Sequence, residues 1–150
     1  LLDKGKPVVI FTNYNKVVDE IMAVYGDRAV KITGGENAKK RDQAKEAFQN
    51  GEKDVIICNM IAGSTGLTLT RSGDLIVNDM CYVPADHLQA EDRVHRIGQD
   101  KPTNIYYMYV ENTIDEKMAS MLESKIDNMG KSIDDKKIDF LEALKAEMEK

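Results

Sequence analysis

Two arginines, Arg93 and Arg96, lie three positions apart in the stretch QAEDRVHRIGQ (89–99), which has the pattern of a helix. Like charges at this spacing are neighbours on a helix and repel by roughly 0.2–0.5 kcal/mol, so an anion is expected close by. Arg96 has Asp92 four positions before it, whereas Arg93 has no carboxylate three or four positions away in either direction. The partner of Arg93 must therefore come from elsewhere in the fold or from a ligand.

On the predicted helix the two arginines share a polar stripe with Gln89. An apolar stripe of Ala90, Val94 and Ile97 runs about a quarter turn away and is expected to face the core. Two interpretations of the polar stripe stay open at this point. It is either a solvated or structurally paired face, which is the commoner case, or an anion site, for which phosphate matches the planar fork of arginine.

The composition is that of a soluble globular protein. The chain has 150 residues, 42% of them hydrophobic and 31% charged, which suffices for one domain with a real core. No apolar run reaches the length of a membrane span and no signal-peptide pattern is present, so we expect an intracellular protein without a membrane partner. The net charge of −5 argues against a surface that coats nucleic acid but allows a local basic track. Because the chain starts without Met and almost at once in a strand, it is expected to be a piece of a longer protein.

The two cysteines give no sign of chemistry. Cys58 and Cys81 lie in or beside apolar strand-like segments, without Cys-x-x-Cys spacing. They are predicted to be small buried hydrophobic residues, and neither a disulfide nor a metal site is expected.

The elements that must position these residues alternate between strand and helix patterns, which is typical of βαβ units. Strands are predicted at 8–12, 29–32, 54–58, 74–79 and 105–110, and helices at about 15–25 and 37–49. We therefore predict an α/β domain of three layers over residues 1–112, with a mainly parallel sheet flanked by helices. A C-terminal helical extension is predicted over 113–150, with a second helix that carries Ile138, Leu141, Leu144 and Met148 on one side.

These pieces resemble, in order, the motifs of the Swi/Snf-type, superfamily-two helicase-like ATPases. QAEDRVHRIGQ resembles motif VI, VVIFTNY resembles motif IV and AGSTGLTLT resembles motif V. The stretch KITGGENAKKRDQAKEAF is similar to the family's glycine loop, with Gly34 followed by Arg41 and Phe48. The stretch TIDEKMASMLESK is similar to the helix that follows the second motor lobe. The resemblance covers roughly residues 7–127 and implies the C-terminal, RecA-like motor lobe.

The chain departs from the family pattern in two places. Motif V has Gly63-Ser64 and Thr68 where two adjacent glycines and an Asn are common, and Thr68 is similar to the annealing-helicase branch. The usual Trp-Asn-Pro ahead of motif VI is Tyr82-Val83-Pro84. These departures bear on the contacts of motif V and leave the arginine pair untouched.

The resemblance also implies a division of labour. The chain has no G-x-x-x-x-G-K-[ST] phosphate loop and no Asp-Glu pair directly after a strand to hold magnesium, and in such motors both belong to the first lobe. ATP and Mg²⁺ would be gripped by that missing N-terminal lobe, and the isolated chain is expected to be inactive. Arg93 and Arg96 would act as arginine fingers on the γ-phosphate, helped by Gln89. Gly66 and Thr68 would lie at the nucleotide.

DNA is the implied polymer partner, held through its phosphates across both lobes. The contacts that the resemblance transfers to this chain are Gly34, Arg41, Asn59 and Ser64. Lys39 and Lys40 are added from their charge and placement. Double-stranded DNA is the expected substrate, with RNA left open, and the isolated lobe is expected to be monomeric.

Two other classes of function are kept as alternatives. The first is a non-catalytic nucleic-acid or protein interaction module derived from such a lobe. The second is a small-molecule phosphohydrolase, which would need a complete nucleotide site within this chain, and the sequence shows none.

Overall fold

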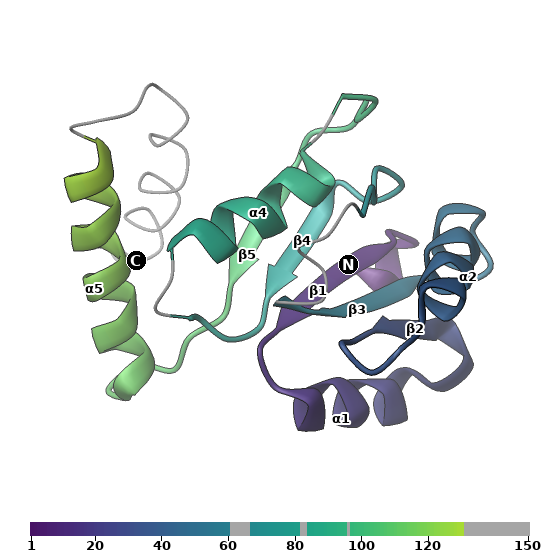
Figure 1. Ribbon diagram of the computed structural model, residues 1–150, viewed down its shortest axis with the longest axis horizontal. Helices are drawn as coiled ribbons and strands as arrows, with labels where there is room; N and C mark the ends of the chain where they lie inside the picture. Colours follow the sequence, from purple (N-terminus) through teal and green to yellow (C-terminus); the bar gives the residue numbers. More distant parts are fainter. Residues whose placement is uncertain (61–66, 82–83, 96, 131–150) are drawn as a thin grey trace.

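The fold is built on a parallel sheet in a computed structural model that describes residues 1–60, 67–81, 84–95 and 97–130. Its strands are β1 (Val8–Thr12), β2 (Ala29–Ile32), β3 (Val55–Asn59), β4 (Asp74–Val77) and β5 (Asn104–Tyr107). They form one five-stranded sheet in the order β2-β3-β1-β4-β5, in which every neighbouring pair is parallel (Figure 1). The predicted parallel sheet is confirmed.

Helices cover both faces of the sheet. The helices are α1 (Asn15–Tyr25), α2 (Ala38–Gln49), α4 (Pro84–Val94) and α5 (Ile114–Gly130), with short 3-10 turns at Leu2–Lys4 and Gly26–Arg28. Helix α1 packs through Val18 on one face, whereas α2 and α4 pack through Phe48 and Val94 on the other (Figure 1). The structure is therefore the three-layer α/β domain that the sequence predicts.

Residue types explain why the central strands and helices form where they do. Strands β1 and β3 are buried along their whole length, as continuous runs of apolar residues in a covered parallel sheet require. Helix α2 begins after Asn37, whose side-chain oxygen accepts a hydrogen bond from the Lys40 backbone N–H at 2.9 Å. This cap sets the point at which the glycine loop turns into the helix.

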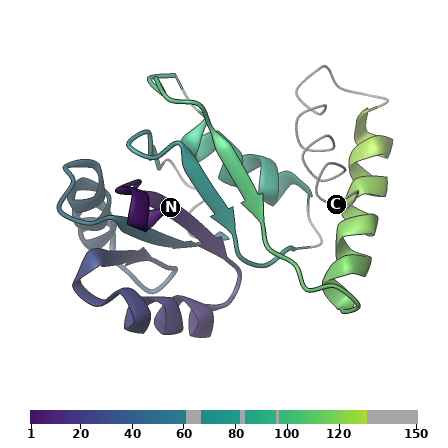
Figure 2. The ribbon, with the colours of Figure 1, turned by 180° about the vertical axis from the view of Figure 1, so that it is seen from behind.

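Helix α5 packs at the β5 edge of the sheet (Figure 2). Its buried side chains Met118, Ala119 and Leu122 form a small cluster with Met80, against which Tyr107 and Tyr109 also pack. The predicted helix after the sheet is confirmed as α5. The predicted domain boundary after residue 112 stays a prediction. The predicted second tail helix lies outside the described residues. Within the described ranges, no helix combines the length and apolar character needed to cross a bilayer.

The helix of the arginine pair is shorter than its sequence pattern indicates. Ala90 and Val94 are buried as predicted, but α4 ends at Val94 and Ile97 is fully exposed, so the prediction that Ile97 continues the apolar stripe is wrong. The physical reason lies just after the helix, because Gly98 adopts a φ of 99°, which turns the chain away from the helical path.

Candidate functional site

The carboxyl ends of β1, β3 and β4 meet in a polar network centred on Asp79. The Asp79 Oδ1 atom accepts hydrogen bonds from the backbone N–H of Asn13 at 2.7 Å and from its side-chain Nδ2 at 2.8 Å. The buried Thr12 hydroxyl donates to the other carboxylate oxygen. These bonds hold the motif IV loop in place. The loop lies at the carboxyl ends of the strands, where parallel α/β sheets bind their ligands.

Asn59, expected at the DNA, has an internal position in this lobe. It is buried, and its amide donates to the Asn13 carbonyl and to Asn15 Oδ1, both at 3.1 Å. The motif IV and motif V strands are thus tied together at their ends. The same loop leaves Tyr14 62% exposed.

The sequence analysis missed Asp79 as a site residue. The available signal was its position, because an Asp two positions after a buried strand lies near the carboxyl ends of a parallel sheet, where ligands bind. Asn13 lay within a loop that was recognised, but its pairing with Asp79 joins residues 66 positions apart.

The motif VI helix brings Arg93 to the C-terminal part of motif V. The Arg93 carbonyl accepts a hydrogen bond from the Leu69 backbone N–H at 3.0 Å. The half-buried guanidinium donates through Nη1 to the Leu67 carbonyl at 3.4 Å. Thr68 lies between these two contacts, so the fold brings two of the expected nucleotide residues together. The partner that Arg93 lacks along its own helix comes in part from backbone 26 positions away.

Other expected residues of the nucleotide and DNA sites divide into two groups. Gln89 is exposed on α4. Arg96, Gly66 and Ser64 lie outside the described residues.

The glycine loop and the first turn of α2 present the basic residues. Lys39 and Lys40 are exposed, and Gly34 faces open space, since a side chain built there would have no neighbour. Arg41 is half-buried, and within the described part of the chain its Nε atom is buried without a hydrogen-bond partner. Buried polar groups are normally satisfied. The unsatisfied Nε therefore distinguishes Arg41 from the two exposed lysines of this turn.

Glu36 secures the base of that loop. Its carboxylate accepts hydrogen bonds from the backbone N–H and the hydroxyl of Thr33, the latter at 2.6 Å. Burial alone would raise the pKa of Glu36, but these two hydrogen bonds and nearby Lys31 outweigh it and lower the pKa. The loop is therefore held by a charged carboxylate at neutral pH.

The buried side of α4 carries a histidine. His87 is 1% exposed, and burial lowers its pKa although nearby carboxylates oppose the shift. Its Nε2 atom lies 3.2 Å from the Cys81 nitrogen and 3.4 Å from the Cys81 sulfur. Cys81 is half-buried and has a histidine neighbour, so its prediction as a buried hydrophobic residue is wrong. The prediction failed because the spacing of Cys81 and His87 did not reveal that the two side chains are in contact.

Two further groups on this side also stay neutral. Tyr107 donates its hydroxyl to Glu91 at 2.5 Å, and its pKa is raised by burial and by that carboxylate. Cys58 is fully buried, as predicted, and burial raises the pKa of its thiol to about 12. Among the residues that the structure describes, no three His, Cys, Asp or Glu side chains converge as a metal site would require.

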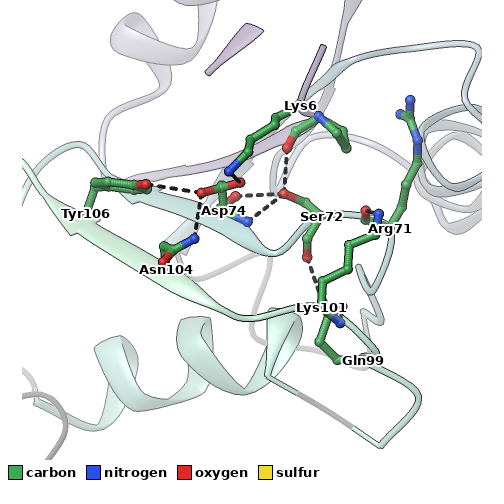
Figure 3. A network of polar contacts seen from close by, with 9 residues as sticks. Lys6, Arg71, Ser72, Asp74, Gln99, Lys101, Asn104 and Tyr106 are labelled. Atoms are coloured by element: carbon green, nitrogen blue, oxygen red, sulfur yellow. Dashed lines mark hydrogen bonds and ion pairs between the residues drawn. The ribbon is translucent and has the colours of Figure 1, made fainter. Parts of the chain in front are cut away.

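At the amino ends of the strands, a network around Asp74 holds the sheet together (Figure 3). This buried carboxylate accepts from Asn104 at 3.0 Å and from the Tyr106 hydroxyl at 3.1 Å, and pairs with Lys6 at 3.6 Å. Ser72 Oγ lies 2.6 Å from the Pro7 carbonyl and accepts from the Asp74 N–H at 2.9 Å. The network joins the amino ends of β1, β4 and β5, and so makes a rigid base beneath the segment that follows motif V.

Comparison with known proteins decides the family. The helicase conserved C-terminal domain matches residues 1–98. The chain belongs to this helicase family. The C-terminal part of the Fun30 ATPase domain superposes on the structure with a TM-score of 0.74, at 26% identity, over 81% of this chain and 40% of that one. The domain therefore has the RecA-like fold of a C-terminal helicase lobe.

Its relatives are SWI/SNF-related. A SWI/SNF-related, actin-dependent regulator of chromatin, subfamily A-like protein 1, from Xenopus tropicalis is 31% identical over 137 residues, which is 88% of this chain and 14% of the relative. The helicase swr1 of Schizosaccharomyces pombe is 32% identical over 129 residues, 83% of this chain and 10% of the relative. The resemblance to a Swi/Snf-type C-terminal lobe is confirmed. The helicase domain spans a small fraction of these relatives.

Proposed function

We propose that this helicase domain is the second motor lobe of a DNA-dependent ATPase or translocase that works inside the cell. A first lobe would hold ATP and Mg²⁺, and this lobe would bring Arg93 and Arg96 to the γ-phosphate when the two lobes close. The observation that carries the proposal is the anchoring of Arg93, whose carbonyl and guanidinium are both bonded to the segment 67–69. A positioned arginine at the junction of motifs V and VI suits a finger better than a freely solvated one.

The chemistry asked of this lobe is placement of charge. Phosphoryl transfer spreads negative charge over the oxygens of the transferring group, and an arginine finger is worth about 10³–10⁵ in rate. The magnesium ion would neutralise phosphate charge from the first lobe. Gln89, exposed on the helix that carries Arg93, would help hold the nucleotide. Thr68 and Gly66 would lie close to the nucleotide. Hydrolysis would then depend on lobe closure, which is also the mechanical step.

The DNA contacts would lie on the glycine loop and the start of α2. Half-buried Arg41 would bind a phosphate through the terminal nitrogens of its guanidinium, and the exposed Lys39 and Lys40 would add charge beside Gly34. Ser64 would contribute from motif V. Asn59 would act by holding the strand ends, since its amide is already bonded to Asn13 and Asn15. Double-stranded DNA is the proposed substrate, with RNA as the comparison in the assay.

The test of the motor role is Arg93→Ala in the full-length protein, with ATP turnover measured at saturating DNA. We expect kcat to fall by about 10² or more, with ATP affinity changed much less. Arg93→Lys should recover little, because a point charge does not reproduce the planar fork. Arg28→Ala is the matched control, since Arg28 pairs with Asp54 on a remote surface. A destabilised but fully active Arg93→Ala protein would refute the finger role.

The test of the DNA role is Arg41→Ala in the same protein. Loss of a phosphate contact should weaken binding about equally on unrelated sequences and reduce the salt dependence by about one ion. Lys45→Ala on the same helix is the control for a simple change of charge. Selective loss of one sequence would point instead to base reading.

A further inference from the structure

Gln99, the last residue of the motif VI stretch, uses its whole amide in contacts with backbone. Its Nε2 donates to the Ser72 carbonyl at 2.7 Å and to the Val94 carbonyl at 3.1 Å, and its Oε1 accepts from the Lys101 N–H at 3.1 Å. Both donors of the amide group are satisfied in this way. The side chain is therefore a clasp between three separate backbone positions.

One of these positions is the end of the motif VI helix. The last carbonyls of a helix have no partner within it, and Val94 closes α4. Gly98, with its φ of 99°, reverses the chain so that Gln99 returns to the helix it has just left. Exposed Ile97 lies in the turn between Val94 and Gln99. Gln99 thus supplies the missing donor and fixes where α4 ends.

A second position, the Ser72 carbonyl, belongs to the rigid base of the sheet. Ser72 is fully buried and is bonded to Pro7 and Asp74 in the network of Figure 3, in which Gln99 also appears. The last turn of α4 is consequently tied to the segment 67–72 at three points. These are the bond from the Leu69 N–H to the Arg93 carbonyl, the bond from Arg93 Nη1 to the Leu67 carbonyl and the bond from Gln99 to the Ser72 carbonyl.

We propose that Gln99 is a positioning residue for Arg93. It holds the last turn of α4 against the sheet, and so keeps the guanidinium of Arg93 in that turn aimed where the lobes close. Gln99 touches neither nucleotide nor DNA in this role. The inference rests on the proposed function, because it needs Arg93 to act on the phosphate.

The experiment compares Gln99→Met with Tyr106→Phe in the full-length protein. Methionine keeps the length of the side chain but donates no hydrogen bond, whereas Tyr106→Phe removes one bond to Asp74 in the same network, away from α4. We expect Gln99→Met to lower kcat at saturating DNA by about 10- to 100-fold, the scale of a misplaced catalytic group, with the KM for ATP little changed. Tyr106→Phe should turn over normally. Gln99→Asn, too short to reach both carbonyls, gives a second variant if methionine prevents folding.

A double-mutant cycle separates positioning from general stability. If Gln99 acts through Arg93, adding Gln99→Met to Arg93→Ala should cost nothing further in kcat. Amide exchange of His95, whose N–H is bonded to the Glu91 carbonyl at 2.9 Å, should speed up in Gln99→Met and stay unchanged in Tyr106→Phe.

The contrary outcomes are distinct. A normal kcat in folded Gln99→Met or Gln99→Asn, beside an inactive Arg93→Ala, overturns this inference alone. An additive loss in the double variant also overturns it. A fully active Arg93→Ala overturns the proposed function and this inference with it.

Discussion

The Asp79 network makes a quantitative prediction about the loop at the ligand edge. Asp79→Ala removes the acceptor of four donors, namely the backbone and side-chain N–H groups of Asn13, the hydroxyl of Thr12 and the side-chain amide of Asn78. A buried donor left without a partner costs about 1–3 kcal/mol, and because Thr12 is buried while Asn13 and Asn78 are half-buried and can turn to water, the whole loss should be about 3 kcal/mol. Asp79→Asn keeps an oxygen for both bonds from Asn13 and loses only the negative charge and one acceptor. It should cost about 1 kcal/mol.

Urea denaturation of the 150-residue chain measures both variants. With an m-value of about 2 kcal/mol/M, the midpoint should fall by about 1.5 M for Asp79→Ala and about 0.5 M for Asp79→Asn. Asp100→Ala, at an exposed carboxylate, is the control and should unfold like the wild type. Amide exchange should also rise at residues 13–15 in Asp79→Ala before it rises in the core. Equal midpoints for the alanine and asparagine variants would show that the hydrogen bonds from Asn13 do not hold the loop.

Three further predictions follow from the lobe. The isolated chain should release no phosphate from ATP above background with or without DNA, because it lacks the phosphate loop and the magnesium carboxylates; robust turnover would defeat the two-lobe account. Iodoacetamide at pH 8 should label Cys81 and spare Cys58, whose pKa is raised to about 12 by burial, and mass spectrometry of the native chain checks this. Burial lowers the pKa of His87, so below its ordinary value of 6.5 the unfolded chain binds a proton that the folded chain resists. The melting temperature of the wild type should therefore fall more between pH 7 and pH 5 than that of His87→Gln, and parallel curves would count against a buried neutral imidazole.

Most of the architecture follows from local patterns. Short, largely apolar runs such as 8–12 and 54–58 favour strands covered on both faces, and the helical periodicity between them implies parallel crossovers. The motif order was enough to predict the family that the comparisons support. These features are legible because each depends on neighbours within a few residues.

Side-chain contacts that the residue pattern does not reveal decided the rest. The end of α4 was misjudged because the pattern of Ala90, Val94 and Ile97 continues past the point where Gln99 and Gly98 close the helix. The pairing of Asp79 with Asn13 arises only when strand ends converge, and the contact of His87 with Cys81, although only six positions apart, follows from no regular periodicity. Sequence determined which residues are available for chemistry, whereas the tertiary structure decided which of them are already bonded to the lobe. The reason is that each such bond requires a partner brought close only by the packing of the sheet.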